Sequence, residues 1–425
     1  MVRARLRRRW YNERSGEIRP KGDRRSMGRA TFAAVAVVLV AFVAAGTASG
    51  LEISGRQAFT GEVVVPKGET WKVLPGAQVR FHGGRLLVRG TLVVEGTALQ
   101  PATIEGDDAF EGVDLRGEAG SRFARAVVSG GRRGVLLTNA SAEFRDVLFR
   151  RNAVGIDVGQ YARVRIDGCT FQGNGRVGLL VKRGGSAEVS ATRFTGAGKA
   201  GIYIYGADNV TIRDCRFEKN TVGLQAGMAG ARAQVSRSVF RENGTGILAE
   251  KTARPSVEGC EVTGNDTGMS FHRRAEGTVK GCRVEENGTG VLVEYSSYPV
   301  FRGNAFRRNR EAAVRLRHQS AEWEGEATEA DREDAGARGA PFGGGDAARG
   351  DFRPGNDGRT SASPAGPPGK RAGLTGTVDF RENEWGELQP QVDRGGNVAG
   401  IHDGRDEPFF EYKGKRYRMD TVLLK

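Results

Sequence analysis

The chain of 425 residues carries 65 lysines and arginines against 51 aspartates and glutamates, a formal net charge of +14. Residues 1–50 hold 11 of the basic and 3 of the acidic residues, so residues 51–425 have a net charge of only +6. A mildly basic chain without an aromatic and basic recognition motif does not indicate a nucleic-acid-binding protein.

The first 50 residues indicate export. An uninterrupted apolar run, ATFAAVAVVLVAFVAAG (30–46), follows several arginines and is succeeded by small residues that offer a cleavage site before Leu51. This pattern is typical of a secretory signal peptide over residues 1–50, with Met27 as an alternative start. We therefore expect a periplasmic or extracellular protein. It would touch a membrane only through this segment, and only if the segment stays uncleaved.

Residues 51–125 alternate apolar and polar residues between glycine and proline turns, for example in LLVRGTLVVEG (86–96). Such alternation predicts short strands. We interpret this region as N-terminal capping coils that cover the first edge of the regular repeats over residues 126–320.

The regular part repeats one short phrase every 22 or 23 residues. Its apolar anchors are Phe149, Phe171, Phe194, Phe217, Phe240, Val262, Val284 and Phe306. Three residues after every anchor except Phe194 stands an asparagine, and a glycine with an apolar–x–apolar triplet follows. A fixed period of this length indicates stacked units that cannot bury their apolar faces alone.

Each repeat has the periodicity of strands. Ile202 and Ile204 lie two residues apart, as do Cys215 and Phe217, and glycines or turn residues interrupt every run long enough for a helix. A coil of three short parallel strands fits a period of 22–23 residues. The frame lacks the leucines of leucine-rich repeats. The sequence thus predicts an all-β fold, a right-handed parallel β-helix solenoid.

The repeated asparagines are predicted to form a ladder at one turn of successive coils. An amide can donate to one neighbouring coil and accept from the other, which stabilises stacked identical side chains. A row of ligand contacts is the alternative interpretation. The glycines next to the asparagines are expected to adopt the left-handed backbone of a tight turn.

The four cysteines form one inward column. Cys169, Cys215, Cys260 and Cys282 each lie two residues before an anchor, at spacings that match no zinc motif. No metal or cofactor site is predicted. Buried free thiols are favoured, although Cys260 and Cys282 would stand on neighbouring coils, where a disulfide could form in an oxidising compartment.

The composition changes at Ala321. Residues 321–373 are dominated by glycine, alanine, proline, serine, aspartate and arginine, which predicts a disordered insertion. The repeat frame then returns as FRENEWG (380–386), and FFEYKGKRYR (409–418) alternates around a predicted hairpin turn at Lys413 and Gly414. We expect residues 374–425 to supply the last coil and a C-terminal cap.

These phrases resemble a known family. RIDGCTFQGN (165–174) and TIRDCRFEKNTVGL (211–224) are similar to the repeats of right-handed parallel β-helix proteins of the pectin-lyase-like superfamily. NEWG (383–386) and IHDGRDEP (401–408) resemble the closing part of its NosD-like periplasmic subgroup. The resemblance implies the fold, while its members include lyases, hydrolases, epimerases and proteins without known catalysis.

One outward column could carry chemistry. Residues four after the repeat glycine place Glu250, His272 and Glu294 on three successive coils, with the carboxylates roughly 10 Å apart by strand spacing. Such a set could serve as an acid pair or as metal ligands. An exposed charge ladder, with the acids flanking an imidazolium, is the simpler interpretation. Tyr203 and Tyr205 could provide a platform for stacking a sugar.

Two functions remain open on these grounds. The chain lacks the paired-aspartate and Gly-His-Gly set of polygalacturonases and the Asp-Pro-His-Asp phrase of alginate epimerases. This favours a non-catalytic binding or structural protein of the cell envelope that recognises an acidic polysaccharide or a protein partner. The alternative is a polysaccharide lyase, hydrolase or epimerase that uses the Glu250, His272 and Glu294 column.

Overall fold

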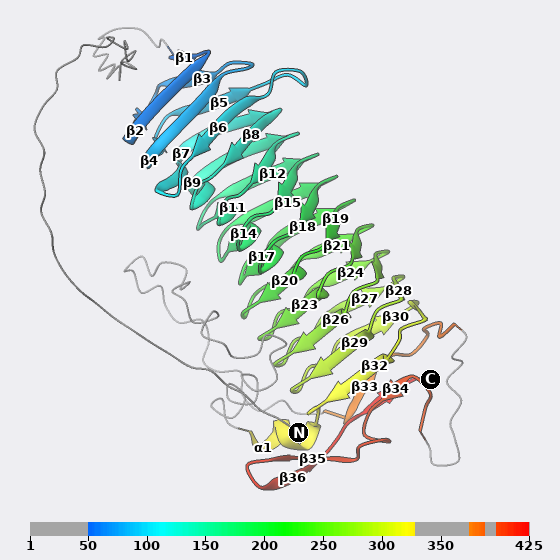
Figure 1. Ribbon diagram of the computed structural model, residues 1–425. Helices are drawn as coiled ribbons and strands as arrows, with labels where there is room; N and C mark the ends of the chain where they lie inside the picture. Colours follow the sequence, from blue (N-terminus) through cyan, green and yellow to red (C-terminus); the bar gives the residue numbers. More distant parts are fainter. Residues whose placement is uncertain (1–49, 328–373, 387–396, 425) are drawn as a thin grey trace, which may run out of the picture. The chain divides into compact units, whose positions relative to one another are not determined.

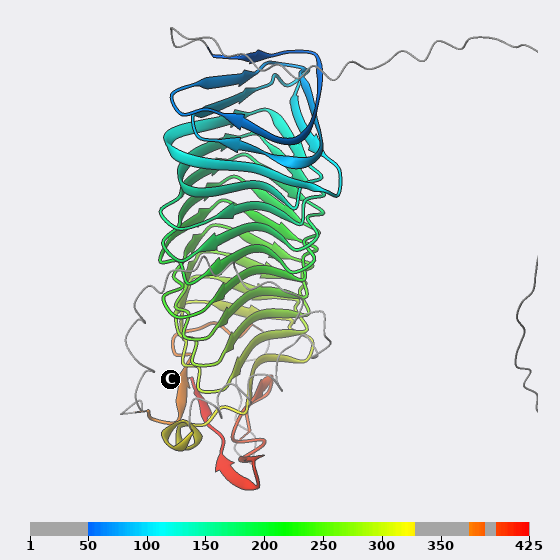
Figure 2. The same ribbon diagram turned by 90° about the vertical axis from the view of Figure 1, so that its left-hand side faces the viewer.

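The computed structural model describes residues 50–327, 374–386 and 397–424. The predicted signal peptide and most of the predicted insertion lie outside these ranges. The described residues form a parallel β-solenoid of about 11 coils, which confirms the predicted fold class. Figures 1 and 2 show the coils stacked in chain order from the blue strands to the yellow ones.

Each regular coil contributes one strand to each of three faces, and the strands of these faces pair in parallel from coil to coil. The first face consists of the second parts of β2 (Arg56–Val65) and β4 (Gln78–Val88), the first parts of β7 (Phe110–Ala124) and β9 (Arg133–Arg145), then β11 (Val154–Val158), β14 (Val177–Lys182), β17 (Ala200–Tyr205), β20 (Val222–Gly227), β23 (Thr245–Glu250), β26 (Thr267–His272), β29 (Thr289–Glu294), β32 (Ala312–Arg317) and β34 (Ile401–His402).

The second face runs beside the first along the whole stack. It consists of β1 (Glu52–Ile53), β3 (Thr70–Val73), β5 (Thr91–Glu95), the second parts of β7 and β9, then β12 (Arg163–Asp167), β15 (Ser186–Ser190), β18 (Asn209–Arg213), β21 (Gln234–Ser236), β24 (Ser256–Glu258), β27 (Thr278–Lys280), β30 (Val300–Arg302), β33 (Thr377–Asp379) and β37 (Thr421–Leu423).

The third face closes each coil and carries the repeat anchors. It consists of the first parts of β2 and β4, then β6 (Ala102–Gly106), β8 (Ala126–Ser129), β10 (Leu148–Arg150), β13 (Thr170–Gln172), β16 (Arg193–Thr195), β19 (Arg216–Glu218), β22 (Val239–Arg241), β25 (Glu261–Thr263), β28 (Arg283–Glu285) and β31 (Ala305–Arg307).

The anchors fill the centre of the solenoid. Phe149, Phe171, Phe194, Phe217 and Phe240 are buried and stack ring on ring, with centroids 4.5–5.0 Å apart. Aromatic rings at this spacing gain contact beyond the burial of their area. A coil length of 22–23 residues therefore places each ring directly above the ring of the preceding coil.

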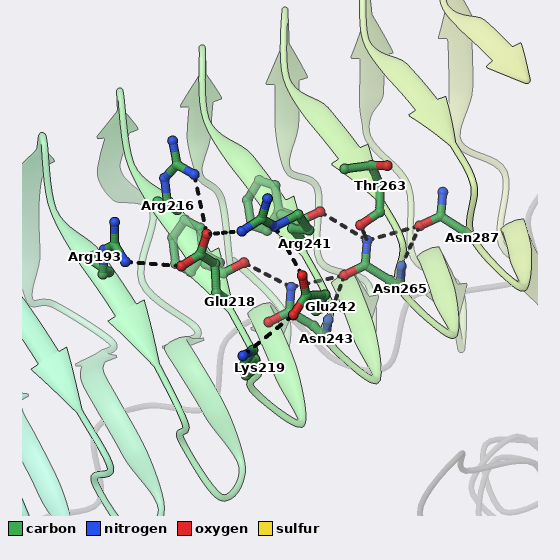
Figure 3. A network of polar contacts seen from close by, with 12 residues as sticks. Arg193, Arg216, Glu218, Lys219, Arg241, Glu242, Asn243, Thr263, Asn265 and Asn287 are labelled. Carbon is green, nitrogen blue, oxygen red and sulfur yellow. Dashed lines mark hydrogen bonds and ion pairs between the residues drawn. The ribbon is translucent and has the colours of Figure 1, made fainter.

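The asparagines form the predicted ladder, part of which Figure 3 shows. The Asn265 side-chain oxygen accepts from the backbone and side-chain nitrogens of Asn243, both at 2.9 Å. Its amide nitrogen donates forward to Asn287 at 2.9 Å and back to the Phe240 carbonyl at 3.0 Å. Ala197 stands where the repeat lacks its asparagine. Its backbone nitrogen donates to the Asn220 side-chain oxygen at 2.9 Å, but its methyl side chain forms no hydrogen bond.

Glycines directly before an asparagine have the expected left-handed backbone, with φ 57° at Gly173 and 65° at Gly264. The glycine that opens each apolar–x–apolar triplet has another role. The left-handed backbone falls on the residue just before each asparagine, for example Lys219 and Glu242, both at φ 55°. Gly246 is not in that conformation. A Cβ added to it would lie 2.5 Å from the carbonyl oxygen of Gly268 on the next coil. Glycine is thus required for close approach between coils rather than for turn geometry.

The cysteine column is also present, and all four thiols are free and buried. The backbone nitrogen of Cys260 donates to the sulfur of Cys282 at 3.4 Å, so these residues stand on neighbouring coils as predicted. Burial raises the pKa of Cys169 and Cys215 to about 12. These two thiols therefore stay protonated at neutral pH and act as small core residues.

The start of the predicted insertion is wrong, because residues 321–326 are ordered. They form α1 (Ala321–Glu326), which Ser320 caps by accepting from the Trp323 backbone. Trp323 and Glu324 are buried. The low-complexity composition therefore begins after a short helix that packs on the end of the solenoid.

The C-terminal hairpin is confirmed. β35 (Phe409–Tyr412) and β36 (Lys415–Arg418) pair antiparallel around Lys413 and Gly414, both of which have positive φ. This matches the primed turns that suit hairpins.

The returning phrase FRENEWG (380–386) joins the stack in another register than expected. Phe380 stacks on Phe301 of the second face at 4.2 Å, and Trp385 continues the anchor column on Phe306 at 5.0 Å. Asn383 accepts from the backbone of Asn304, at 2.8 Å, and so extends the cysteine column rather than the asparagine ladder.

Candidate functional site

The three residues of the predicted column do stand on adjacent strands of the first face. Glu250 ends β23, His272 ends β26 and Glu294 ends β29, and the register pairs each with the next. The two carboxylates are therefore two coils apart, as expected.

The expectation that this column is an exposed charge ladder is wrong. His272 and Glu294 are buried, at 3% and 0% exposure. Burial lowers the pKa of His272 to about 3, so its ring is neutral and cannot be the imidazolium between two acids. Glu294 is instead paired with Arg317, while burial raises the pKa of its carboxyl group. Glu250 accepts from Gln225 at 2.8 Å.

Burial of a neutral histidine predicts a pH-dependent stability. The pKa of His272 falls from 6.5 to about 3 on folding, so the unfolded chain binds a proton at a higher pH than the folded chain does. Its contribution to stability is present above pH 6.5 and is lost as the pH falls. Between pH 7 and pH 5 the loss should be about 2 kcal/mol. Urea denaturation at both pH values measures the difference in the free energy of unfolding between pH 7 and pH 5. In His272→Gln this difference should be smaller than in the unmodified chain by about 2 kcal/mol.

The half-exposed His82 supplies a matched control for this experiment. The variant His82→Gln should keep the full pH dependence of the unmodified chain. An equal pH dependence in His272→Gln and in the unmodified chain would contradict a neutral, buried His272.

The two tyrosines do not form an open stacking platform. Tyr203 is 7% exposed and belongs to an apolar cluster on the outer side of the first face, which also contains Leu180 and Leu248. Burial raises the pKa of its hydroxyl group. Lys199 lies 4.5 Å above the Tyr203 ring, and Tyr205 meets that ring edge-on at 5.8 Å.

An open groove lies on the second face, where the sequence suggested no site. It has a volume of about 550 Å³ and crosses the strands β7, β9, β12, β15 and β18. The register aligns four exposed side chains of alternating charge along it: Arg122, Glu143, Arg165 and Glu188. A second hollow of about 400 Å³ shares the first three of these residues.

The charges in this groove are available to a ligand. Among the described residues, neither Arg163 nor Arg165 has an ion-pair or hydrogen-bond partner for its side chain, and the same holds for Glu143 and Glu188. Across both hollows, four arginines face four acids, so the lining is balanced in charge. The sequence signal for this row is the alternation of charged and apolar residues in RVRID (163–167).

The described residues do not offer a metal centre. Within the ranges covered by the structure, no three histidine, cysteine, aspartate or glutamate side chains come together as a ligand set. The cysteine thiols are buried, and the Cys169 and Cys215 sulfurs contact backbone carbonyls. Metal binding to thiols requires deprotonation, which burial opposes here. This donor set does not fit a copper or zinc ion.

The stacked parallel coils define the fold class of this molecule, a parallel β-helix. Residues 103–240 match the family described as "Right handed beta helix region", and residues 186–336 match the family described as "Periplasmic copper-binding protein (NosD)". Among curated proteins, none matches the chain. In the described ranges, no helix has the length and apolar character needed to cross a membrane.

Several solved structures are similar to the chain. One is the A-module of the Azotobacter vinelandii mannuronan C-5 epimerase AlgE6, with 14% identity over 57% of this chain and 82% of the other, at a TM-score of 0.43. Another is a variant of the periplasmic alginate epimerase AlgG, with 11% identity over 62% and 76%, at 0.45. A third is an alginate lyase from Paenibacillus sp. str. FPU-7, with 16% identity over 58% and 92%, at 0.25.

Proposed function

We propose that this protein is an exported, non-catalytic β-helix that binds a polysaccharide in the groove of its second face. The unpaired charges of Arg163, Arg165, Glu143 and Glu188 carry this proposal. Export is supported by the apolar segment 30–46 and by the periplasmic location in the description of the NosD family.

The lining suits a chain of sugars. Strands of successive coils repeat about every 4.8 Å, so the groove presents a regular row of donors and acceptors across the coils. A guanidinium group donates in a planar fork and a carboxylate accepts at two oxygens, which allows paired bonds to neighbouring hydroxyl groups. Small residues between them, such as Ser141 and Ser186, leave room for a ring to approach.

The balanced charge refines the expected partner. The preference for an acidic chain rested on the net charge of residues 51–425, whereas the groove and the second hollow together have as many acids as bases. The proposed ligand of the groove is therefore a polysaccharide recognised through its hydroxyl groups, with carboxylates accepted beside Arg163 and Arg165. An envelope protein is the alternative partner.

The arrangement supports binding more than cleavage. Glu143 and Glu188 are exposed and lie two coils apart with Arg165 between them. Neither is enclosed in the apolar surroundings that convert one carboxyl group into a general acid. Glu294 is enclosed, but Arg317 pairs with it and the site is closed to a polymer.

Retention of the full chain on neutral and uronate-containing polysaccharides tests this proposal. Arg163→Gln combined with Arg165→Gln should weaken retention roughly tenfold or more, because each variant loses a charge-assisted hydrogen bond. Retention on uronate-containing chains should also fall as salt rises, since exposed charges are screened beyond about 8–10 Å. No new reducing ends or unsaturated products should appear.

Arg254→Gln is the matched control, because Arg254 is also exposed but is paired with Glu276 outside the groove. If the double variant binds as well as this control, the groove is not the binding site. Turnover that disappears in Glu143→Gln or Glu188→Gln would establish an enzyme in the groove, and loss in Glu250→Gln or Glu294→Gln would place catalysis on the first face.

A further inference from the structure

Three arginines converge on one carboxylate of the third face, as Figure 3 shows. Arg193 on β16, Arg216 on β19 and Arg241 on β22 donate to Glu218 on β19, at 3.3, 3.3 and 3.0 Å. The register places Arg193 directly beside Arg216. Three successive coils thus bring their guanidinium groups together around one acceptor, which we call the Glu218 cluster.

The Glu218 cluster carries an excess of positive charge. Three guanidinium groups share one carboxylate, which leaves a net charge of +2. The adjacent Lys219 and Glu242 cancel each other at 3.7 Å, with Glu242 also contacting Arg241 at 3.4 Å. Like charges held this close repel, so a bound anion would lower the free energy of the cluster.

The three arginine side chains are exposed to solvent, whereas the Glu218 carboxylate that they contact is nearly buried. The Glu218 side chain is 11% exposed, whereas those of Arg193, Arg216 and Arg241 are 54%, 45% and 47% exposed. Each guanidinium group has five N–H donors, of which Glu218 takes only one from each of the three arginines. The buried carboxylate therefore holds the forks in place and leaves most of their donors facing solvent.

We infer that the Glu218 cluster is a binding site for a tetrahedral oxyanion, sulfate or phosphate. Guanidinium forks match the oxygens of such groups and form the stronger, charge-assisted hydrogen bonds. A net charge of +2 on the site complements a doubly charged anion. The site lies on the third face and does not depend on the groove of the second face, so either can fail without the other.

Calorimetric titration of the full chain with sodium sulfate, at constant ionic strength maintained with chloride, tests this inference. The unmodified chain should bind sulfate at one saturable site. Arg216→Gln and Arg193→Gln should each weaken binding about tenfold or more, which is the loss of one charge-assisted hydrogen bond. Arg216→Lys should also weaken it, because an ammonium group lacks the planar fork. Circular dichroism melts verify that each variant is folded.

Arg283→Gln is the matched control. Arg283 lies on the same face, is 61% exposed and forms a neutral pair with Glu261 at 2.6 Å. This variant should bind sulfate like the unmodified chain. Equal losses in Arg283→Gln and Arg216→Gln would reveal general electrostatic attraction and overturn the inference, as would unchanged binding in both cluster variants.

Dextran sulfate and unmodified dextran then distinguish the source of the anion. If dextran sulfate competes with inorganic sulfate for the unmodified chain but not for Arg216→Gln, the ligand of the site is a sulfate group carried by a polymer. Binding of inorganic sulfate without competition would assign a free ion. Retention of unmodified dextran that depends on Arg216 would contradict an oxyanion site.

Discussion

Replacement of Glu324 by alanine is expected to lower the free energy of unfolding by about 3–5 kcal/mol, the cost of breaking a buried ion pair. Glu324 in α1 pairs with Arg274, and their side chains are 0% and 5% exposed. Removal of the carboxylate leaves the guanidinium group buried beside the solenoid without its counter-ion. The large effect would come from this uncompensated charge rather than from the net strength of the pair.

Urea denaturation of Glu324→Ala, Arg274→Met and the combined variant Arg274→Met with Glu324→Leu measures this effect. The combined variant should recover most of the lost stability, because two apolar side chains replace both charges. Glu322→Ala in the same helix is the control, since Glu322 is exposed and accepts a hydrogen bond from the Arg418 backbone. A loss below about 1 kcal/mol in Glu324→Ala would show that α1 is not docked on the solenoid.

Asn265→Ala should destabilise the fold by about 1–3 kcal/mol, because the buried groups it leaves behind lose their hydrogen bonds. Asn265 is fully buried. Its removal deprives the Asn243 backbone and amide of their acceptor, and the Phe240 carbonyl and Asn287 oxygen of a donor. Both neighbouring coils are affected, which is the physical property that makes a ladder cooperative.

Asn309→Ala provides the comparison. Asn309 accepts from Asn287 and donates to the Val284 carbonyl, but among the described residues no asparagine continues the ladder beyond it. Its loss should therefore cost less than that of Asn265. Thermal melts that find both variants neutral would contradict a structural ladder.

The period, the ladder and the hairpin could be predicted from the sequence because each rests on local or repeated chemistry. A phenylalanine every 22 or 23 residues must stack when the coils have that length, and an asparagine three positions later must reach the same turn. The turn at Lys413 and Gly414 follows from the backbone that those two positions must adopt.

The errors arose where two segments far apart in the chain meet. Residues 321–326 read as part of a low-complexity stretch, yet Trp323 is buried beside Tyr295 and Tyr417. As a motif, FRENEWG (380–386) fits the asparagine ladder and the cysteine column equally well. The stacking of Phe380 on Phe301 and of Trp385 on Phe306 decides between them.

The repeat alone was enough to predict the solenoid, the order of its columns and the adjacency of Glu250, His272 and Glu294, because a fixed repeat length converts chain position into height along the stack. Which of these columns water can reach depends instead on how the folded chain packs against them. His272 and Glu294 on the first face are buried, and burial keeps the His272 ring neutral. Arg165 in the groove and Arg216 beside Glu218 are exposed to solvent. Alternation along a strand shows which side a residue faces, but its accessibility depends on what packs against that side.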